Sequence, residues 1–370
     1  MSHPGSIPNT MISARDRIGC SEHFVTILAG CREEPDKMFQ RLGQELQRIG
    51  GTIAKMDSIG LFTPSGAAEL EQRYCVDCPS CQLKSGSVYD SRQCPVNALF
   101  VHTVSGTSVS PVWLGGQIVG TSYEDEHARY CQLNDVLPEP HLSRDKQVRQ
   151  VLERSELALK SAGMSFSDVV RTWFHLDHIF DWYDLFNQSR DQFFKERGVY
   201  ERLVPASTGV GGANQANTDI VCNLLAVQSK NGAVSIRTVP SPLQCPAIEY
   251  GSSFSRAVEI EAPDHKRLFI SGTASIAPAG ETLFKGDVDQ QIEQTMKVVM
   301  AILDSRGLKW TDVTRAIGYV KERRDLVAFE RYCARQEILS RPVVVVVNDV
   351  CREDLLFELE LDAVQLRLST

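Results

Sequence analysis

The chain has 370 residues, of which 42% are hydrophobic and 23% charged, and its formal net charge is −8. These proportions are ordinary for a folded globular protein and exclude a collagen-like, fibrous or disordered chain. The acidic balance argues against nucleic acid or an anionic membrane surface as a partner, because both require a basic footprint. No apolar run approaches the ~20 residues of a membrane span, since the longest β-branched block is Val343–Val347.

The N-terminal segment and the cysteine usage predict a cytoplasmic protein. Residues 1–20 lack the charged start and apolar centre of a secretory signal. The eleven cysteines are odd in number and mostly scattered, which indicates a reducing compartment and largely free thiols.

Three segments of the chain repeat one pattern: an amphipathic helix, a glycine and then a strand. The first and faintest copy covers residues 39–62, and Gly50–Gly51 ends its helix. Apolar residues spaced four, four and three apart mark one face of that helix: Met38, Leu42, Leu46 and Ile49.

A group of cysteines follows this first copy. Three are spaced three residues apart and a fourth lies near by: Cys75, Cys78, Cys81 and Cys94. Thiolates on a tight turn can converge on Zn²⁺ or an iron–sulfur cluster. The paired CxxC…CxxC arrangement is absent, so a disulfide or free thiols remain the alternative. Any metal here would be structural, and apart from this candidate zinc we expect no required cofactor.

The second and third copies cover Leu152–Leu176 and Thr295–Val320. Gly163 and Gly307 stand where a helix needs a left-handed C-terminal residue, and an aspartate follows each of them five residues later. In the third copy one helix face is marked by spacings of four, three and four: Ile292, Met296, Val299 and Leu303.

Strand-like segments flank each copy. HFVTILAG, VWLGGQIVG and RLFISGTASI are expected to open the units, and NALFVHTV, VCNLLAVQS and LLFELELDAVQL to close them. The linker Val239–Pro246 has three prolines in eight residues and marks a boundary. We therefore divide the chain into units 20–106, 111–230 and 245–370. The expected fold class is α+β, with helices covering one face of each mixed sheet.

This order of elements resembles the Rid/YjgF superfamily, which has a chorismate-mutase-like fold. Its simple members are single units that form trimers with clefts between subunits. The resemblance covers the third unit best and the first least, and it implies an intramolecular pseudo-trimer that is a monomer or a low-order homo-oligomer. It also implies that the diverged first unit is structural and that the third unit carries the active site.

Within that superfamily, the chain resembles the chorismatases, which are long, multi-unit members. The similar stretches of the third unit are Tyr250–Ile260, Leu268–Glu281 and Gly286–Thr295. In the second unit, RTWFHLDHIFDWYDLFNQSRDQFF from Arg171 and PASTGVGG from Pro205 are also similar.

The last strand places acids on one face. Alternation along Phe357–Asp362 puts Glu358, Glu360 and Asp362 on the side opposite the apolar residues. By itself this pattern is typical of a half-solvated strand. By resemblance, Glu358 takes the place of a glutamate that faces the cleft, which in chorismatases is the proposed proton donor.

The chemistry implied by the resemblance requires an uncharged acid. Protonation of the enolpyruvyl ether of chorismate gives an oxocarbenium ion, which is attacked and then loses pyruvate. The pKa of Glu358 must therefore rise from ~4.3 through burial or a neighbouring acid. Glu360 lies two residues on and is able to supply like-charge repulsion.

Further site residues follow from the resemblance. Cys351 resembles a cysteine of the chorismatase branch that makes 3-hydroxybenzoate instead of a dihydrodiol, and Gly272 in ISGTAS is consistent with that branch. The adjacent Thr273 and Ala274 are expected to line the substrate. On residue type alone, Cys351 is equally typical of a buried thiol that packs as a small hydrophobe.

The substrate implied by the resemblance is a small dianion, whose carboxylates favour arginine forks. We expect Arg331 to bind it with Tyr250 as a hydroxyl partner, and Arg256 and Arg171 are further candidates. Arg315 is also available, although any single arginine is more typical of a solvated surface.

Two other functions remain open at this stage. One is a non-catalytic binding protein for a small carboxylate metabolite. The other is an imine or enamine deaminase, but the arginine that such members carry two residues after a late proline is absent. Val344 follows Pro342 at that distance, and Ser207 follows Pro205.

Overall fold

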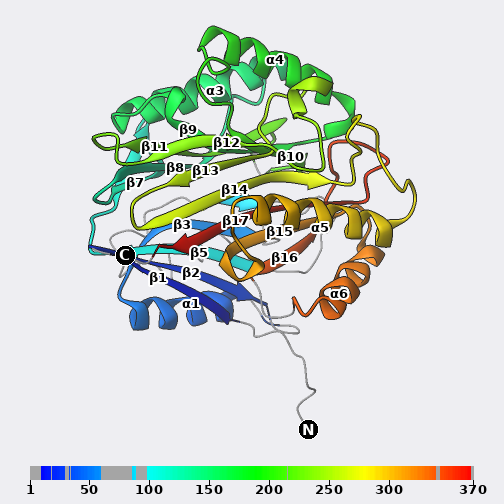
Figure 1. The fold of residues 1–370 in the computed structure, drawn as a ribbon. Coiled ribbons are helices and arrows are strands. Elements are labelled where there is room, and N and C mark those ends of the chain that lie inside the picture. The colour runs from blue at the N-terminus through cyan, green and yellow to red at the C-terminus, as the bar shows by residue number, and fades with distance from the viewer. Residues whose placement is uncertain are drawn as a thin grey trace.

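The computed structural model describes residues 10–17, 19–29, 33, 35–59, 86–88, 98–214, 216–338 and 342–367. In this part of the chain, three β-sheets of five, six and six strands pack together, and the helices lie on the outside (Figure 1). The predicted α+β fold of three units, each a sheet covered by helices, is thus confirmed. The cysteines Cys75, Cys78, Cys81 and Cys94 lie outside the described residues.

The first unit forms a five-stranded sheet in the order β1-β2-β5-β3-β4, covered by one described helix. Strands β3 and β4 are parallel and the other pairs are antiparallel. Its elements are β1 (Thr10–Arg17), β2 (Cys20–Leu28), α1 (Pro35–Ile49), β3 (Thr52–Ile59), β4 (Gly86–Val88) and β5 (Ala98–Ser105).

The second unit forms a six-stranded sheet in the order β10-β9-β11-β8-β7-β6. Its elements are β6 (Ser110–Leu114), β7 (Gln117–Glu124), β8 (Ala128–Val136), α3 (Arg144–Ser161), β9 (Val169–Leu176), α4 (Tyr183–Glu196), β10 (Ala206–Gly211) and β11 (Ile220–Ser229).

The third unit repeats this connectivity strand for strand, in the order β16-β15-β17-β14-β13-β12. Its elements are β12 (Ser235–Val239), β13 (Ala257–Glu261), β14 (His265–Ala274), α5 (Val288–Ser305), β15 (Val313–Val320), α6 (Leu326–Arg335), β16 (Val343–Val347) and β17 (Phe357–Leu366). Strands β1 and β12 each begin before the start that we assigned to their unit.

The predicted helix ends are confirmed. Gly50, Gly163 and Gly307 follow the three helices with φ near +70°, a conformation that costs glycine little. In the second and third units the chain then turns in the same way. The backbone N–H of Ser165 donates to Asp168 over 2.8 Å, and an equivalent bond links Lys309 to its aspartate three residues on.

One predicted strand is wrong. The segment VWLGGQIVG forms a hairpin, in which β6 and β7 pair across Gly115 and Gly116. Adjacent glycines with positive φ suit a two-residue hairpin turn, so the chain reverses here although apolar residues on both sides favour one continuous strand. The strand that corresponds to β2 and β14 is β8, which pairs with the closing strand β11.

Each helix layer packs on its own sheet through apolar side chains. The α5 face predicted from the sequence, formed by Ile292, Met296, Val299 and Leu303, is fully buried. Burying one such side chain stabilises the fold by about 1.5–3 kcal/mol. Since the helices cover the outer faces, the inner sheet faces of the units contact one another.

Hydrogen bonds join the second and third units along β10 and β14. The Ser207 N–H donates to Ser271 Oγ over 2.9 Å. The Gly272 N–H donates to Thr208 Oγ1 over 3.0 Å. These bonds fix β10 of one unit against the inner face of the next, beside the cavity described below. No helix among the described residues is long and apolar enough to cross a membrane.

Candidate active site

A cavity of about 460 Å³ lies between the second and third units. Helix α4 and strand β10 form the wall from the second unit, and β14, β17 and two loops form the wall from the third. The side chains and backbone that line it are Tyr183, Asp184, Asn187, Gln188, Arg190, Asp191, Ser207, Gly209, Tyr250, Gly251, Ser252, Phe254, Arg256, Gly272, Ala274, Ile276, Cys351, Arg352 and Glu358.

Glu358 is the buried acid of this cavity, which Asp184 and Asp191 of α4 also line. Its residue is only 4% exposed, and burial together with the neighbouring Glu360 raises its pKa to about 8. A proton therefore remains on this carboxyl at neutral pH. Gly272 on the adjacent strand leaves the required space, because a Cβ at that position would overlap the Glu358 carboxylate and lie 2.9 Å from its Cδ.

Glu360 does not line the cavity, although it shares the face of Glu358. Arg171 Nη2 lies 2.5 Å from its Oε2, and Arg315 Nη1 lies 2.9 Å from its Oε1. Burial opposes ionisation, but Arg315 and Arg171 hold the pKa of Glu360 below its ordinary value. The placement of Arg171 and Glu360 therefore argues against our prediction that they contact substrate. The two groups neutralise each other in the core.

Two arginines of the cavity are buried and form no direct ion pair with the described residues, although the nearby Asp191 favours the charged form of Arg190. Arg190 is 2% exposed, donates to Asn187 Oδ1 over 2.7 Å and lies 4.7 Å from the Phe186 ring centroid. Arg256 is 3% exposed, and its Nε donates to the Cys245 carbonyl over 3.0 Å. Among the described residues neither forms an ion pair, and Arg256 Nη2 has no hydrogen-bond partner. A buried unpaired cation favours an anionic ligand.

Cys351 and Tyr183 are neighbours in the lining of the cavity. Burial and the neighbouring Glu358 raise the pKa of the Cys351 thiol to about 12. Burial and the neighbouring Cys351 likewise raise the pKa of Tyr183. Both groups are therefore protonated at neutral pH, and Cys351 contributes a small neutral surface rather than a thiolate nucleophile.

Some of the remaining residues that we predicted to bind substrate line the cavity, and others do not. Tyr250, Gly272 and Ala274 line it, whereas Thr273 is buried beside it and donates to the Ser271 carbonyl over 2.8 Å.

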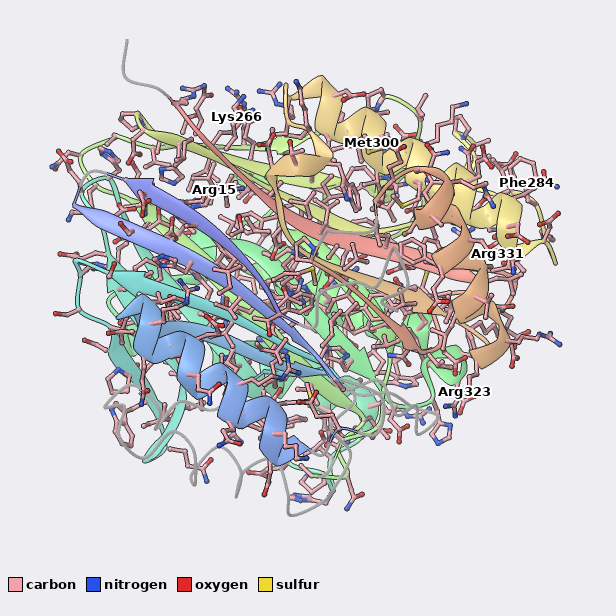
Figure 2. The ribbon with its side chains drawn as sticks, turned by 90° about the horizontal axis from the view of Figure 1, so that it is seen from below. Arg15, Lys266, Phe284, Met300, Arg323 and Arg331 are labelled. Atoms are coloured by element: carbon pink, nitrogen blue, oxygen red, sulfur yellow. The ribbon has the colours of Figure 1, made fainter. Side chains whose placement is uncertain are left out.

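Arg331 lies away from the cavity. Its side chain is 53% exposed and forms an ion pair of 3.0 Å with Asp289 on α5, at the edge of the molecule (Figure 2). This placement argues against our prediction that Arg331 binds the substrate, because α6 covers the outer face of its sheet, whereas the cavity faces the inner side.

The second-unit wall was not predicted from the sequence. Tyr183, Asn187 and Arg190 project from α4, and Ser207 and Gly209 lie on β10. The available signal was that both elements fall inside the second-unit stretches that resemble chorismatases.

Only one of the three closing strands carries an acid at this position. A β-bulge at the same place in each unit aligns Glu358 of β17 with Val221 of β11 and Ala98 of β5. The corresponding positions of the first and second units thus hold apolar side chains that have no proton to donate.

No group of three or more possible metal ligands occurs among the residues that the structure describes. The zinc prediction concerns cysteines outside that part of the chain and stays a prediction.

Comparisons with known proteins agree with the fold. The endoribonuclease L-PSP family model matches residues 247–365. A RutC family protein of Pyrococcus horikoshii is 33% identical over 95 residues, which cover 25% of this chain and 75% of the relative. The chain belongs to the Rid/YjgF superfamily.

Within this superfamily the chain is similar to chorismatases. A chorismatase of Streptomyces hygroscopicus is 29% identical over 215 residues, or 52% of this chain and 60% of the relative. A 3-hydroxybenzoate synthase of the same species is 27% identical over 222 residues, which cover 53% of this chain and 63% of the relative. A solved chorismatase structure shares the fold with a TM-score of 0.63 and 21% identity, over 95% of this chain and 100% of that chain. The matched region thus spans about 60% of the length of these curated relatives.

Proposed function

We propose that the protein cleaves the enolpyruvyl ether of chorismate and releases pyruvate. The reaction takes place in the cavity between the second and third units, with Glu358 as the general acid. The observation that carries this proposal is the buried carboxyl of Glu358 in a cavity that also holds the buried guanidinium groups of Arg190 and Arg256.

The arginines define the substrate class. The buried Arg190 and Arg256, with Arg352 beside them, outnumber the two aspartates of the lining, which suits a compact molecule with carboxylate groups. Cys351 and Tyr183 are uncharged at neutral pH, so the acidic side chains that line the cavity besides Glu358 are those of Asp184 and Asp191 on α4. Chorismate has both carboxylates and an enol ether that an acid can protonate.

The proposed reaction begins with proton transfer from Glu358 to the terminal methylene of the enol ether. Water attacks the resulting oxocarbenium ion, and the proton that this water loses returns to Glu358. Collapse of the hemiketal breaks the bond between its carbon and the ring oxygen, which releases pyruvate and leaves the ring as a dihydrodiol. Loss of one ring hydroxyl as water, with aromatisation, then gives a hydroxybenzoate. A donor with a pKa near the working pH is both populated and reactive, which is the requirement for general acid catalysis.

The ring product is the finer part of the proposal. The similarity to a 3-hydroxybenzoate synthase, with Cys351 in the cavity wall and Gly272 beside the acid, favours a hydroxybenzoate over a dihydrodiol.

Incubation of the purified protein with chorismate tests the function directly. We expect pyruvate, measured by its reduction with lactate dehydrogenase, and a hydroxybenzoate, measured by chromatography, in equal amounts. Glu358→Gln should abolish both products while the protein remains folded. Arg331→Ala is the matched control at the surface and should retain activity.

Other outcomes point to the alternatives. Thermal stabilisation by chorismate without any product would indicate a binding protein for a dicarboxylate. Release of ammonia from an imino acid would indicate a deaminase. Full turnover in Glu358→Gln would remove the proposed acid.

A further inference from the structure

Glu360 is the buried carboxylate next to the acid, and residues of two units hold it. Arg171 on β9 and Arg315 on β15 each contact one of its oxygens. Thr208 on β10 donates its hydroxyl to the same group. Each of these side chains is buried, so the carboxylate is stabilised by protein groups in place of water.

This arrangement lies where all three units meet. Arg315 Nε lies 3.1 Å from Asp57 Oδ2 of β3, and Lys55 Nζ lies 3.1 Å from the same oxygen. Aligned on the shared β-bulge, Lys55, Arg171 and Arg315 occupy the same position in their respective units. Each unit therefore contributes one cation to the centre, and Glu360 lies between two of them.

The charges around Glu358 do not all act in the same direction. The ionisable groups that interact with it from the surrounding elements are Glu360 on its own strand, Arg171 on β9, Arg256, Cys351, Tyr183 on α4 and Tyr319 on β15. The thiol and the two phenols are uncharged at neutral pH, because burial raises the pKa of each. The two arginines favour the ionised form of Glu358, and Glu360 favours the protonated form.

We propose that Arg171 and Arg315 are positioning residues that hold Glu360 as a fixed anion, and that this anion sets the pH range in which Glu358 can donate a proton. The inference rests on the proposed role of Glu358 as the acid. Because Arg171 comes from the second unit and the partner of Arg315, Asp57, comes from the first, packing of all three units controls the protonation of one carboxyl in the third.

The size of the effect follows from the strand geometry. The side chains of Glu358 and Glu360 are about 6–7 Å apart at their bases. With an effective dielectric constant of about 20, two unit charges at this distance change a pKa by about one to two units. Loss of the Glu360 charge should therefore lower the titration midpoint of Glu358. Loss of Arg315, which pairs with Glu360 and is not among the charges that act on Glu358 directly, should also lower it, because Glu360 is then held less firmly as an anion.

The test is a titration of Glu358 in the full chain by NMR of ¹³Cδ-labelled glutamate. The signal is assigned by its absence in Glu358→Gln. We expect Glu360→Gln to lower the midpoint by at least about one pH unit and Arg315→Gln to shift it in the same direction. Glu22→Gln is the matched control: this residue is equally buried and paired with Arg267 at 2.5 Å, but it does not line the cavity, so the midpoint should not move.

The two variants test the proposal separately, so it stays open to refutation if one of them fails to fold. An unchanged or raised midpoint in either folded variant would overturn it. The alkaline limb of the pH–rate profile with chorismate should move in parallel with the NMR midpoint. If chorismate is not turned over at all, the proposed function fails, but the NMR titration still decides whether Glu360 controls Glu358.

Discussion

Replacing the buried acid should stabilise the protein, and more so as the pH rises. Burial and Glu360 raise the pKa of Glu358 from its ordinary value of 4.5 to about 8. Between these values the folded state binds more protons than the unfolded chain, so the stability of the wild type falls as the pH rises through this window and levels off above about 8. Glutamine has nearly the same shape but does not titrate.

The magnitude follows from the width of the window. A difference of about 3.5 pKa units at about 1.4 kcal/mol each means that Glu358 lowers the free energy of unfolding of the wild type by about 5 kcal/mol above pH ~8. This value is the upper limit of the stabilisation expected from Glu358→Gln. Near pH 5 the two proteins should have almost the same stability.

Urea denaturation of wild type and Glu358→Gln at about pH 5, 7 and 9 measures this difference. The free energy of unfolding of the variant should exceed that of the wild type by an amount that increases with pH. A difference that is constant with pH, or one that favours the wild type at pH ~9, would refute the inference that Glu358 is protonated in the folded state.

Four further outcomes are expected. Gly272→Ala should lower kcat at least about 100-fold while the protein stays folded, because the new methyl group displaces the Glu358 carboxyl; kcat and thermal unfolding check this. Arg190→Gln should raise KM for chorismate at least about tenfold, as the loss of a charge-assisted hydrogen bond implies. Arg331→Ala should change neither kcat nor KM, because the side chain lies on the outer face. At pH ~8 Cys351 should react with iodoacetamide far more slowly than a free thiol, as peptide mass spectrometry can measure, because its pKa is about 12.

The repeated unit and its acidic strand could be predicted from the sequence because both depend on local periodicity. The spacing of four apolar residues along α5 identifies the helix face that packs on the sheet, and the structure buries all four: Ile292, Met296, Val299 and Leu303. Alternation along β17 likewise places Glu358 and Glu360 on one face before any contact is known.

Periodicity could not show which residues of different units meet. Glu358 and Glu360 have the same pattern in the sequence, yet one faces a cavity and the other is neutralised by Arg171 from another sheet. Arg331 and Arg190 both lie on helices, but α6 covers an outer face and α4 borders the cavity.

The sequence by itself therefore determined the three repeated units, their helix ends and the strand that carries the acid, because these follow from spacings within short segments. The tertiary structure alone decided which carboxyl is protonated and which arginines are unpaired. Burial and the distance between charges set both properties, and both depend on how the second unit packs against the third.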